Sequence, residues 1–473
     1  MPFCKLPSRT LAYSGIIASL LFPIEAVRAA TFWYASPNGS HAGSGSAGNP
    51  WDIATAFAGG NGAVRPGDVI YLRGGTYKIC TTVHPDPWNP YCLASTVAGS
   101  FNAPVTIRSA AGEWAVLDGG GPVLSSEGVL IFVKGNYVQF QHFEIMSSNL
   151  ATRQTLHPGS SVSDVDGWAF DIIASHVKVA NLVIHDLGGG IGSFNNYDDI
   201  EIYGNVIYYI GWQGPDRGHG HAIYVHNSTT VRILNNIVFD QFDIGLHLYG
   251  GTLPHYDVEG NTVFNSGVLS YSGAAIDLLL GDDNGNVAAS PIVLNNRSYS
   301  LTIQKAKAAN IGLSSGCINL THSHNYYVGS TTLVNCTVNS MVGNTFYGAT
   351  SGFSSSLYTD NTYYAKRPSG VQVFVQPNSY EAGSGYITIY NWADETSVSA
   401  NVSSVLMPGD AYKVLDAQHY HGAPVAGGTY LGGAISISMP DSSALVEPLV
   451  GNGVVSPIHT PKEFGAFVLI KQR

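Results

Sequence analysis

The chain has 473 residues, of which 55 are Gly and 27 are Tyr, and 11% are charged against a globular norm of about 25%. It carries 21 Lys and Arg against 32 Asp and Glu, a formal net charge of −11. This balance excludes a nucleic-acid binder, which needs a basic footprint, and 45% hydrophobic content excludes a disordered chain. Abundant Gly, Asn, Thr and β-branched residues favour strands joined by turns.

The N-terminus has the pattern of a secretory signal peptide. Lys5 and Arg9 precede an apolar stretch over 14–24, and small residues follow at 26–30. We therefore predict a signal peptide over 1–30, with a buried N-terminal strand as the alternative. Cleavage after Ala30 takes the net charge to −13, because Lys5, Arg9, Arg28 and Glu25 are removed. The expected product is a secreted or periplasmic monomer that has no contact with a membrane.

From about residue 130 to 365 one pattern recurs, in which a short apolar strand, an Asn and a second apolar strand follow one another. Such a unit cannot bury its apolar residues alone, whereas stacked units can, so we predict an all-β solenoid, a parallel β-helix. The asparagines would then stack as a ladder inside the turns. They are Asn181, Asn205, Asn236, Asn261, Asn296, Asn325, Asn344 and Asn361.

Four cysteines remain after signal cleavage, and an even number in an exported chain indicates disulfides. Cys317 and Cys336 each lie eight residues before a ladder asparagine, so they occupy the same position on neighbouring coils. Neighbouring strands are about 4.8 Å apart, which suits a disulfide. We predict the pairs Cys317–Cys336 and Cys80–Cys92.

Two segments lie outside the repeats. Residues 31–75 predict a cap for the open end of the solenoid, with a strand, a short helix over about 52–57 and a strand ending at Gly75. After Lys366 the Asn pattern stops, and alternating strands at short spacing predict a β-sandwich. We therefore divide the mature chain into a capped β-helix over 31–369 and a sandwich over 370–473. The expected role of the sandwich is to pack against the end of the β-helix, with carbohydrate binding as the alternative.

The segments FWYASPNGS and PGDVIYLRGGTY, together with the Asn-bearing coils, resemble secreted right-handed parallel β-helix proteins of the pectate-lyase-like superfamily. The resemblance covers about residues 31–365. It implies a right-handed β-helix and a polysaccharide as the binding partner. It does not define the reaction, because the fold supports lyases, hydrolases, epimerases and glycan-binding proteins.

The strands that follow the turns can be aligned on the asparagines, at 168–173, 190–195, 222–227, 245–250, 275–280 and 317–322. Alternation then predicts three outward columns. The first column holds small residues, at Ala169, Gly190, Ala222, Gly245 and Ala275. The second holds Asp171, Gly192, Tyr224, His247, Asp277 and Asn319. The third holds Ile173, Phe194, His226, Tyr249, Leu279 and Thr321, and Ile318 is among the residues expected to point inward.

Tyr and His side chains cluster beside the column of small residues, and a loop, GPDRGHGH, adds further polar groups. An ordinary polar face is the alternative, but the density of His favours a reaction site. The predicted catalytic residues are Tyr224, His226, His247, Tyr249, Arg217 and Asp277. The predicted substrate-binding residues are His219, His221, Asp171, Phe194, Arg232 and Asn319.

These residue types suit cleavage of a uronate-containing glycan by β-elimination. Tyr and His can act as base and acid, Arg217 can neutralise the substrate carboxylate, and Asp277 beside His247 can orient its ring. A C5-epimerase needs the same groups. A glycoside hydrolase would need Asp277 and a second carboxylate from a loop. A non-catalytic glycan-binding surface protein is the alternative of another class.

The net negative charge opposes an acidic substrate, which calls for local cations or a bound metal ion. Asp282 and Asp283 in the segment GDDNGN supply oxygen ligands that suit Ca²⁺. The segment lacks the spacing of a known calcium loop, so a solvated turn is the favoured interpretation. Apart from this Ca²⁺ candidate, the sequence predicts no cofactor.

Overall fold

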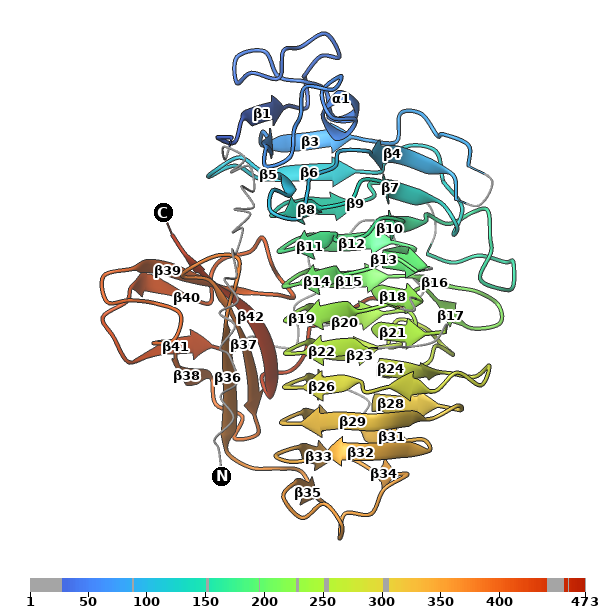
Figure 1. Cartoon of the computed structure of the whole chain (residues 1–473). Coiled ribbons are helices and arrows are strands. Elements are labelled where there is room, and N and C mark those ends of the chain that lie inside the picture. The colour runs from blue at the N-terminus through green and yellow to red at the C-terminus, as the bar shows by residue number, and fades with distance from the viewer. Residues whose placement is uncertain are drawn as a thin grey trace, which may run out of the picture.

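The computed structural model describes residues 28–86, 89–149, 153–194, 196–226, 229–250, 255–300, 306–439, 455–457 and 459–472. Within them, three long parallel sheets wind around one core as a parallel β-helix (Figure 1). The expected fold class is therefore confirmed. The predicted signal peptide falls almost entirely on residues 1–27, outside the described residues. No helix in the described part of the chain is long and apolar enough to cross a membrane.

The three parallel sheets contribute one strand each to most coils. Sheet I contains β1 (Phe32–Ala35), β2 (Val69–Leu72), β5 (Val105–Ser109), β8 (Val138–Gln141), β11 (Lys178–Ala180), β14 (Ile200–Tyr203), β19 (Val231–Leu234), β22 (Tyr256–Glu259), β26 (Ile292–Leu294), β29 (Cys317–Ser323), β25 (Ala288–Ala289) and β32 (Cys336–Ser340). Sheet II contains β4 (Tyr91–Ser95), β7 (Val129–Val133), β10 (Trp168–Ile172), β13 (Gly189–Phe194), β18 (Ile223–His226), β21 (Leu246–Tyr249), β24 (Ile276–Asp282), β28 (Lys307–Leu313), β31 (Ser330–Leu333) and β34 (Thr350–Ser351). Sheet III contains β3 (Gly75–Lys78), β6 (Ala115–Asp118), β9 (Glu144–Met146), β12 (Val183–Leu187), β15 (Val206–Ile210), β20 (Ile237–Gln241), β23 (Thr262–Ser266), β27 (Arg297–Tyr299), β30 (Tyr326–Val328), β33 (Thr345–Tyr347) and β35 (Thr362–Tyr364).

The predicted asparagine ladder runs through the turns between sheets I and III. Each buried Asn donates both its backbone N–H and its side-chain amide to the side-chain oxygen of the next Asn, for example Asn205 to Asn236 at 3.0 and 2.9 Å. The ladder consists of Asn205, Asn236, Asn261, Asn296, Asn325, Asn344 and Asn361. Every coil thereby satisfies polar groups of its neighbour, which fixes the register of stacking.

Asn181 is not a member of this ladder, which corrects the sequence-based alignment by one residue. Leu182 occupies the ladder position, and its backbone N–H donates to Asn205 at 2.9 Å. Asn181 has φ +57°, the left-handed conformation that Asn tolerates, and the same position in the next coil is Gly204 with φ +64°. The turn thus uses Asn for two different reasons, and the sequence pattern does not separate them.

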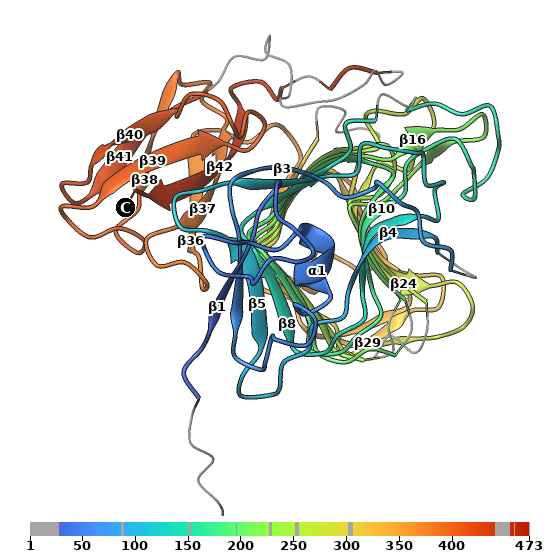
Figure 2. The same ribbon diagram turned by 90° about the horizontal axis from the view of Figure 1, so that it is seen from above.

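Both predicted disulfides are present, with Cα–Cα distances of 4.7 Å for Cys80–Cys92 and 4.3 Å for Cys317–Cys336. The second pair joins strands in register, as expected from the spacing. The predicted cap helix is α1 (Ile53–Phe57), which begins after Asp52, whose carboxylate accepts the Thr55 N–H at 2.7 Å. It lies across the end of the core (Figure 2).

The C-terminal segment forms two antiparallel sheets. Sheet IV contains β36 (Val371–Pro377), β37 (Gly385–Asn391), β42 (Phe464–Lys471), β39 (Ala411–Asp416) and β40 (Ala426–Thr429), and sheet V contains β38 (Ser397–Asn401) and β41 (Ala434–Ser438). Both lie beside the β-helix and not at its end, which corrects the expected packing (Figures 1 and 2). The Tyr390 hydroxyl donates to the Ser298 carbonyl of sheet III at 2.8 Å, so sheet IV covers sheet III.

Candidate functional site

A cavity of about 410 Å³ opens on the outer face of sheet II, where two long loops rise beside the strands. Its floor and walls carry several aromatic faces together with a few polar groups, a combination typical of small-molecule and sugar sites. The lining residues are Asn89, Ser126, Glu127, Val129, Ser160, Trp168, Asp171, Phe194, Trp212, Arg217, His219, Gly220, His221 and Tyr224.

The strand register confirms the first part of the predicted outward column. Asp171 pairs with Gly192, Gly192 with Tyr224, and Tyr224 with His247. The structure thus brings together, from four successive coils, residues that are 76 positions apart in the chain.

Beyond His247 the predicted alignment is wrong by two residues. The partner of His247 on β24 is Leu279, and Asp277 lies two residues before Leu279, level with Gly245. Asp277 is 3% exposed and accepts a hydrogen bond from the Ser298 hydroxyl. Burial raises the pKa of Asp277 to about 7. Because side chains alternate with a period of two, a shift of two residues preserves the apolar pattern and is invisible in the sequence. Asp277 does not orient His247.

Two further predicted residues are placed on sheet I, away from the cavity. Asn319 lies on β29, and the strand that continues sheet II is β28, whose Asn310 pairs with Leu279. Ile318, expected to point inward, is 45% exposed. Arg232 lies on β19 and binds Asp199 at 2.8 Å and Glu201 at 3.0 Å.

The centre of the site is a compact group of Tyr and His rings. Tyr224 and His247 are stacked, with centroids 4.5 Å apart and an interplanar angle of 7°. His221 lies edge-on to both, at 5.1 Å from Tyr224 and 4.6 Å from His247. Its Nε2 is 3.4 Å from Nδ1 of His247, so the imidazoles share a weak hydrogen bond.

Burial determines the protonation of this group. It lowers the pKa of His247 to about 3, with smaller contributions from Arg217 and His226, and it lowers the pKa of His221 well below its usual range. It raises the pKa of Tyr224 to about 12. Near neutral pH the site therefore combines a protonated phenol with two uncharged imidazoles.

Tyr249 and His226 lie at the edge of this group, with ring centroids 6.3 Å apart. The Tyr249 hydroxyl donates to Asp283, and this bond raises the Tyr249 pKa. Asp282 is fully buried and accepts from the amide groups of Asn284 and Asn286 within its own turn. Its oxygens are thus used by the turn, and no group of three potential metal ligands is found among the described residues.

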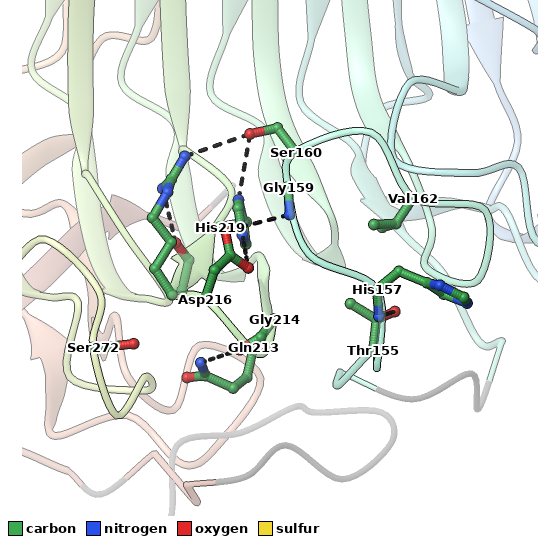
Figure 3. A network of polar contacts seen from close by, with 12 residues as sticks. Thr155, His157, Gly159, Ser160, Val162, Gln213, Gly214, Asp216, His219 and Ser272 are labelled. Atoms are coloured by element: carbon green, nitrogen blue, oxygen red, sulfur yellow. Dashed lines mark hydrogen bonds and ion pairs between the residues drawn. The ribbon is translucent and has the colours of Figure 1, made fainter.

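Arg217 and His219 reach the cavity from the hairpin of β16 (Trp212–Gln213) and β17 (Gly218–His219). Arg217 Nη1 donates to Asp243 at 2.5 Å, while its Nη2 has a 3.4 Å contact with the Ser160 hydroxyl. His219 stacks on Trp212. It lies between Asp216 and Ser160, and the Gly159 N–H also donates to Asp216 (Figure 3). These bonds join the two loops above the cavity.

Asp171 lies in the floor of the cavity as predicted. One carboxylate oxygen accepts from Asn89 at 2.8 Å, and the other has no hydrogen-bond partner among the described residues. Burial, with a smaller contribution from Asp86, raises the Asp171 pKa to about 6. Asp171 therefore exchanges a proton close to neutral pH.

Sequence reasoning missed several lining residues, of which Trp168 and Trp212 are the largest. Trp168 pairs with Gly189 at the start of β10, and its ring centroid is 5.8 Å from that of Phe194. It directly precedes Ala169 of the first predicted column, so the strand alignment could have revealed it. Trp212 lies on β16 of the hairpin outside the three repeating sheets, and Ser160 and Glu127 come from loops, so no repeat aligned them.

No protein-family model matches the chain, and the search of curated proteins finds no match. Among solved structures, the chain is similar to pectate lyase Pel9A, with 18% identity, 71% of this chain and 82% of that one covered, and a TM-score of 0.47. A rhamnogalacturonan lyase matches with 12% identity, coverages of 62% and 87%, and a TM-score of 0.40. XylC in complex with xylose matches with 11% identity, coverages of 93% and 100%, and a TM-score of 0.38. The parallel β-helix that the resemblance implied is confirmed by the three parallel sheets of the chain itself, and function has to be inferred from the site.

Proposed function

We propose that this protein is an exported enzyme that cleaves a uronate-containing polysaccharide by β-elimination, in the cavity on sheet II. The observation that carries the proposal is the stack of protonated Tyr224 on neutral His247, with His221 against both. The aromatic faces of Trp168, Phe194 and Trp212 offer apolar surface for the C–H faces of sugar rings. The two disulfides fit an oxidising compartment.

In this reaction a base removes the C5 proton of the uronate, the C4–O bond breaks, and an acid protonates the leaving oxygen. The imidazole of His247 is the proposed base, and the Tyr224 hydroxyl is the proposed acid. A bound uronate carboxylate would raise the His247 pKa from about 3, because a nearby negative charge favours the imidazolium form. The electron pair of the broken C–H bond becomes the C4–C5 double bond of the product.

Arg217 is the proposed partner of the substrate carboxylate. It is the one Lys or Arg among the residues that line the cavity, and its side chain is 43% exposed. Its Nη1 donates to Asp243. Its Nη2 has only a long, 3.4 Å contact with the Ser160 hydroxyl, so it can donate to a carboxylate of the substrate instead. We infer that Asp243 positions the guanidinium and Nη2 binds the carboxylate.

The test is a panel of uronate polysaccharides, followed by the ultraviolet absorbance of the unsaturated product. We expect the absorbance to rise with the native protein and its rate to fall at least about 100-fold in Tyr224→Phe. Tyr364→Phe, an exposed tyrosine on β35, is the matched control and should keep the native rate. Equal rates in both variants would contradict the assigned site. Binding without any turnover would instead favour the non-catalytic glycan-binding protein.

A glycoside hydrolase is the second candidate, favoured by Asp171. A buried carboxyl with a pKa of about 6 is suited to donate a proton near neutral pH, and Glu127 lines the same cavity. In that case new reducing ends appear without ultraviolet absorbance. Asp171→Asn should then abolish turnover, whereas a lyase would lose mainly substrate affinity.

A further inference from the structure

A second cavity, of about 440 Å³, lies between the β-helix and the antiparallel sheets, away from the Tyr and His group. Arg108, Trp114 and His142 line it from the β-helix, and Lys413, Tyr420 and His421 line it from the C-terminal segment. We call it the interdomain cleft. Both parts of the chain are needed to form it, so it exists only in the assembled fold.

The cleft carries positive charge that the structure leaves unbalanced. Arg217, Arg232 and Lys471 are each paired with a carboxylate. Arg108 and Lys413 have no such partner among the described residues, although both line the cleft. Glu381 is the one acidic lining residue, and it lies 3.7 Å from His142. In a chain with a net charge of −11, two unpaired cations on one cleft indicate a site for an anionic ligand.

Trp114 provides a rigid aromatic surface in the same cleft. Its indole N–H donates to Glu144 at 2.8 Å, and Glu144 is in turn held by His185 at 3.1 Å and His421 at 2.8 Å. These bonds fix the plane of the indole before any ligand binds, which lowers the entropic cost of binding. Tyr420 lies 6.2 Å from Trp114 and extends the aromatic wall.

We propose that the interdomain cleft is a second saccharide-binding site, which takes an acidic sugar residue. The sugar ring packs against Trp114, and its carboxylate binds the Arg108 guanidinium and the Lys413 ammonium. The proposal assigns binding alone to the cleft: His421 Nε2 is engaged by Glu144 at 2.8 Å, and His142 lies 3.7 Å from Glu381. The site holds the polysaccharide on the protein and is independent of whether the cavity on sheet II performs elimination or hydrolysis.

The experiment is calorimetric titration of the full mature chain with oligouronates of galacturonate, mannuronate and glucuronate, and with xylotetraose as the neutral probe. The background variant His247→Ala removes the proposed base, and the readout is the change in binding when cleft residues are replaced, so it does not depend on elimination taking place on sheet II. We expect two bound oligouronates per chain for the background variant. Adding Arg108→Ala and Lys413→Ala should remove one of them, or weaken it at least about tenfold.

The matched control removes two lysines that lie outside the cleft. Lys366→Ala and Lys462→Ala change the net charge by the same amount, at exposed positions. Loss of binding in the cleft variant but not in this control supports the proposal, provided that both have the same unfolding temperature as the His247→Ala background variant. An equal loss in both variants, unchanged binding in the cleft variant, or equal affinity for xylotetraose would overturn it. Trp114→Phe, which keeps an aromatic face, should retain more affinity than Trp114→Ala.

Discussion

The outer faces of sheets II and III both carry a stack of rings, but the two stacks have different surroundings. On sheet III, aligned positions of five coils hold His185, Tyr208, Phe239, Phe264 and Tyr299, with neighbouring rings of the first four 4.8 to 5.0 Å apart and nearly parallel. On sheet II the stack consists of Tyr224 and His247, and it ends at Gly192 on one side and Leu279 on the other.

The difference lies in what covers each stack. Sheet IV closes over the sheet III stack, and Phe464 packs on Tyr299 at 4.4 Å, so these rings are at most 2% exposed. The sheet II stack borders a cavity that two loops surround. The same geometric rule, one ring per coil, thus produces a structural stack where a sheet covers it and a candidate reaction site where loops leave space. Stacking by itself is no evidence of function.

Replacing a ring in the sheet II stack should have the largest effect on turnover. His247→Ala is expected to lower kcat by about 10² to 10⁴, because it removes the proposed base. Its effect on stability should be smaller than that of a fully buried ring, since the His247 side chain is only half-buried. Steady-state rates on a uronate polysaccharide and thermal unfolding measure the two effects. A variant that is fully active but unfolds early would assign this stack a structural role in place of the proposed catalytic one.

Replacing a ring in the sheet III stack should instead lower stability strongly and turnover little. Phe239→Ala removes a fully buried ring between two parallel neighbours and is expected to cost about 3–5 kcal/mol of unfolding free energy. Denaturant unfolding measures this cost, and kcat of the folded protein should stay within a few-fold of the native value. A kcat loss as large as that of His247→Ala would remove the functional distinction between the two stacks.

Asp277→Asn tests a buried carboxyl that lies close to the sheet II stack without belonging to it. The folded-state pKa of about 7 exceeds the usual value of 3.8, so the folded state binds the proton more tightly. The Asp277 contribution to stability is therefore present at low pH and is lost as pH rises from about 4 to 7. The variant lacks this pH dependence. Above pH 7 its free energy of unfolding should therefore exceed that of the native protein by up to roughly 4 kcal/mol.

Denaturant unfolding of both proteins between pH 4 and 8 gives the comparison. The other buried carboxyls are the same in both, so their contributions cancel in the difference. Parallel curves would show that Asp277 is ionised in the folded protein. The rate of glycan cleavage should change little, because Asp277 does not line the cavity.

Much of the fold could be predicted from local features of the chain. The spacing of asparagines such as Asn236 and Asn261 indicated coils, and the matching spacing of Cys317 and Cys336 gave a disulfide that the structure contains. Within sheet II the alignment of Asp171, Tyr224 and His247 is right, because a small residue and then an inward apolar residue precede each of them.

The errors occur where the same local pattern is present twice or where a strand is missed. Ala275 and Ile276 repeat the small–apolar pattern two residues before the true register, so Asp277 was misaligned, and β28 was overlooked in favour of β29. Residues outside the repeating strands, such as Trp212 on β16 and Ser160 in a loop, were not found, because no repeat relates their positions. The place of the C-terminal sheets beside sheet III depends on contacts between residues far apart, such as Tyr390 and Ser298.

The sequence by itself determined the repeating coil, the ladder, the disulfides and the row of Tyr and His residues, because all of these depend on short-range periodicity. The tertiary structure alone decided which ring stack is covered and which borders a cavity, and it also created the interdomain cleft. The physical reason is that burial, the pKa values of His247 and Asp171, and the pairing of each cation depend on which distant segments meet.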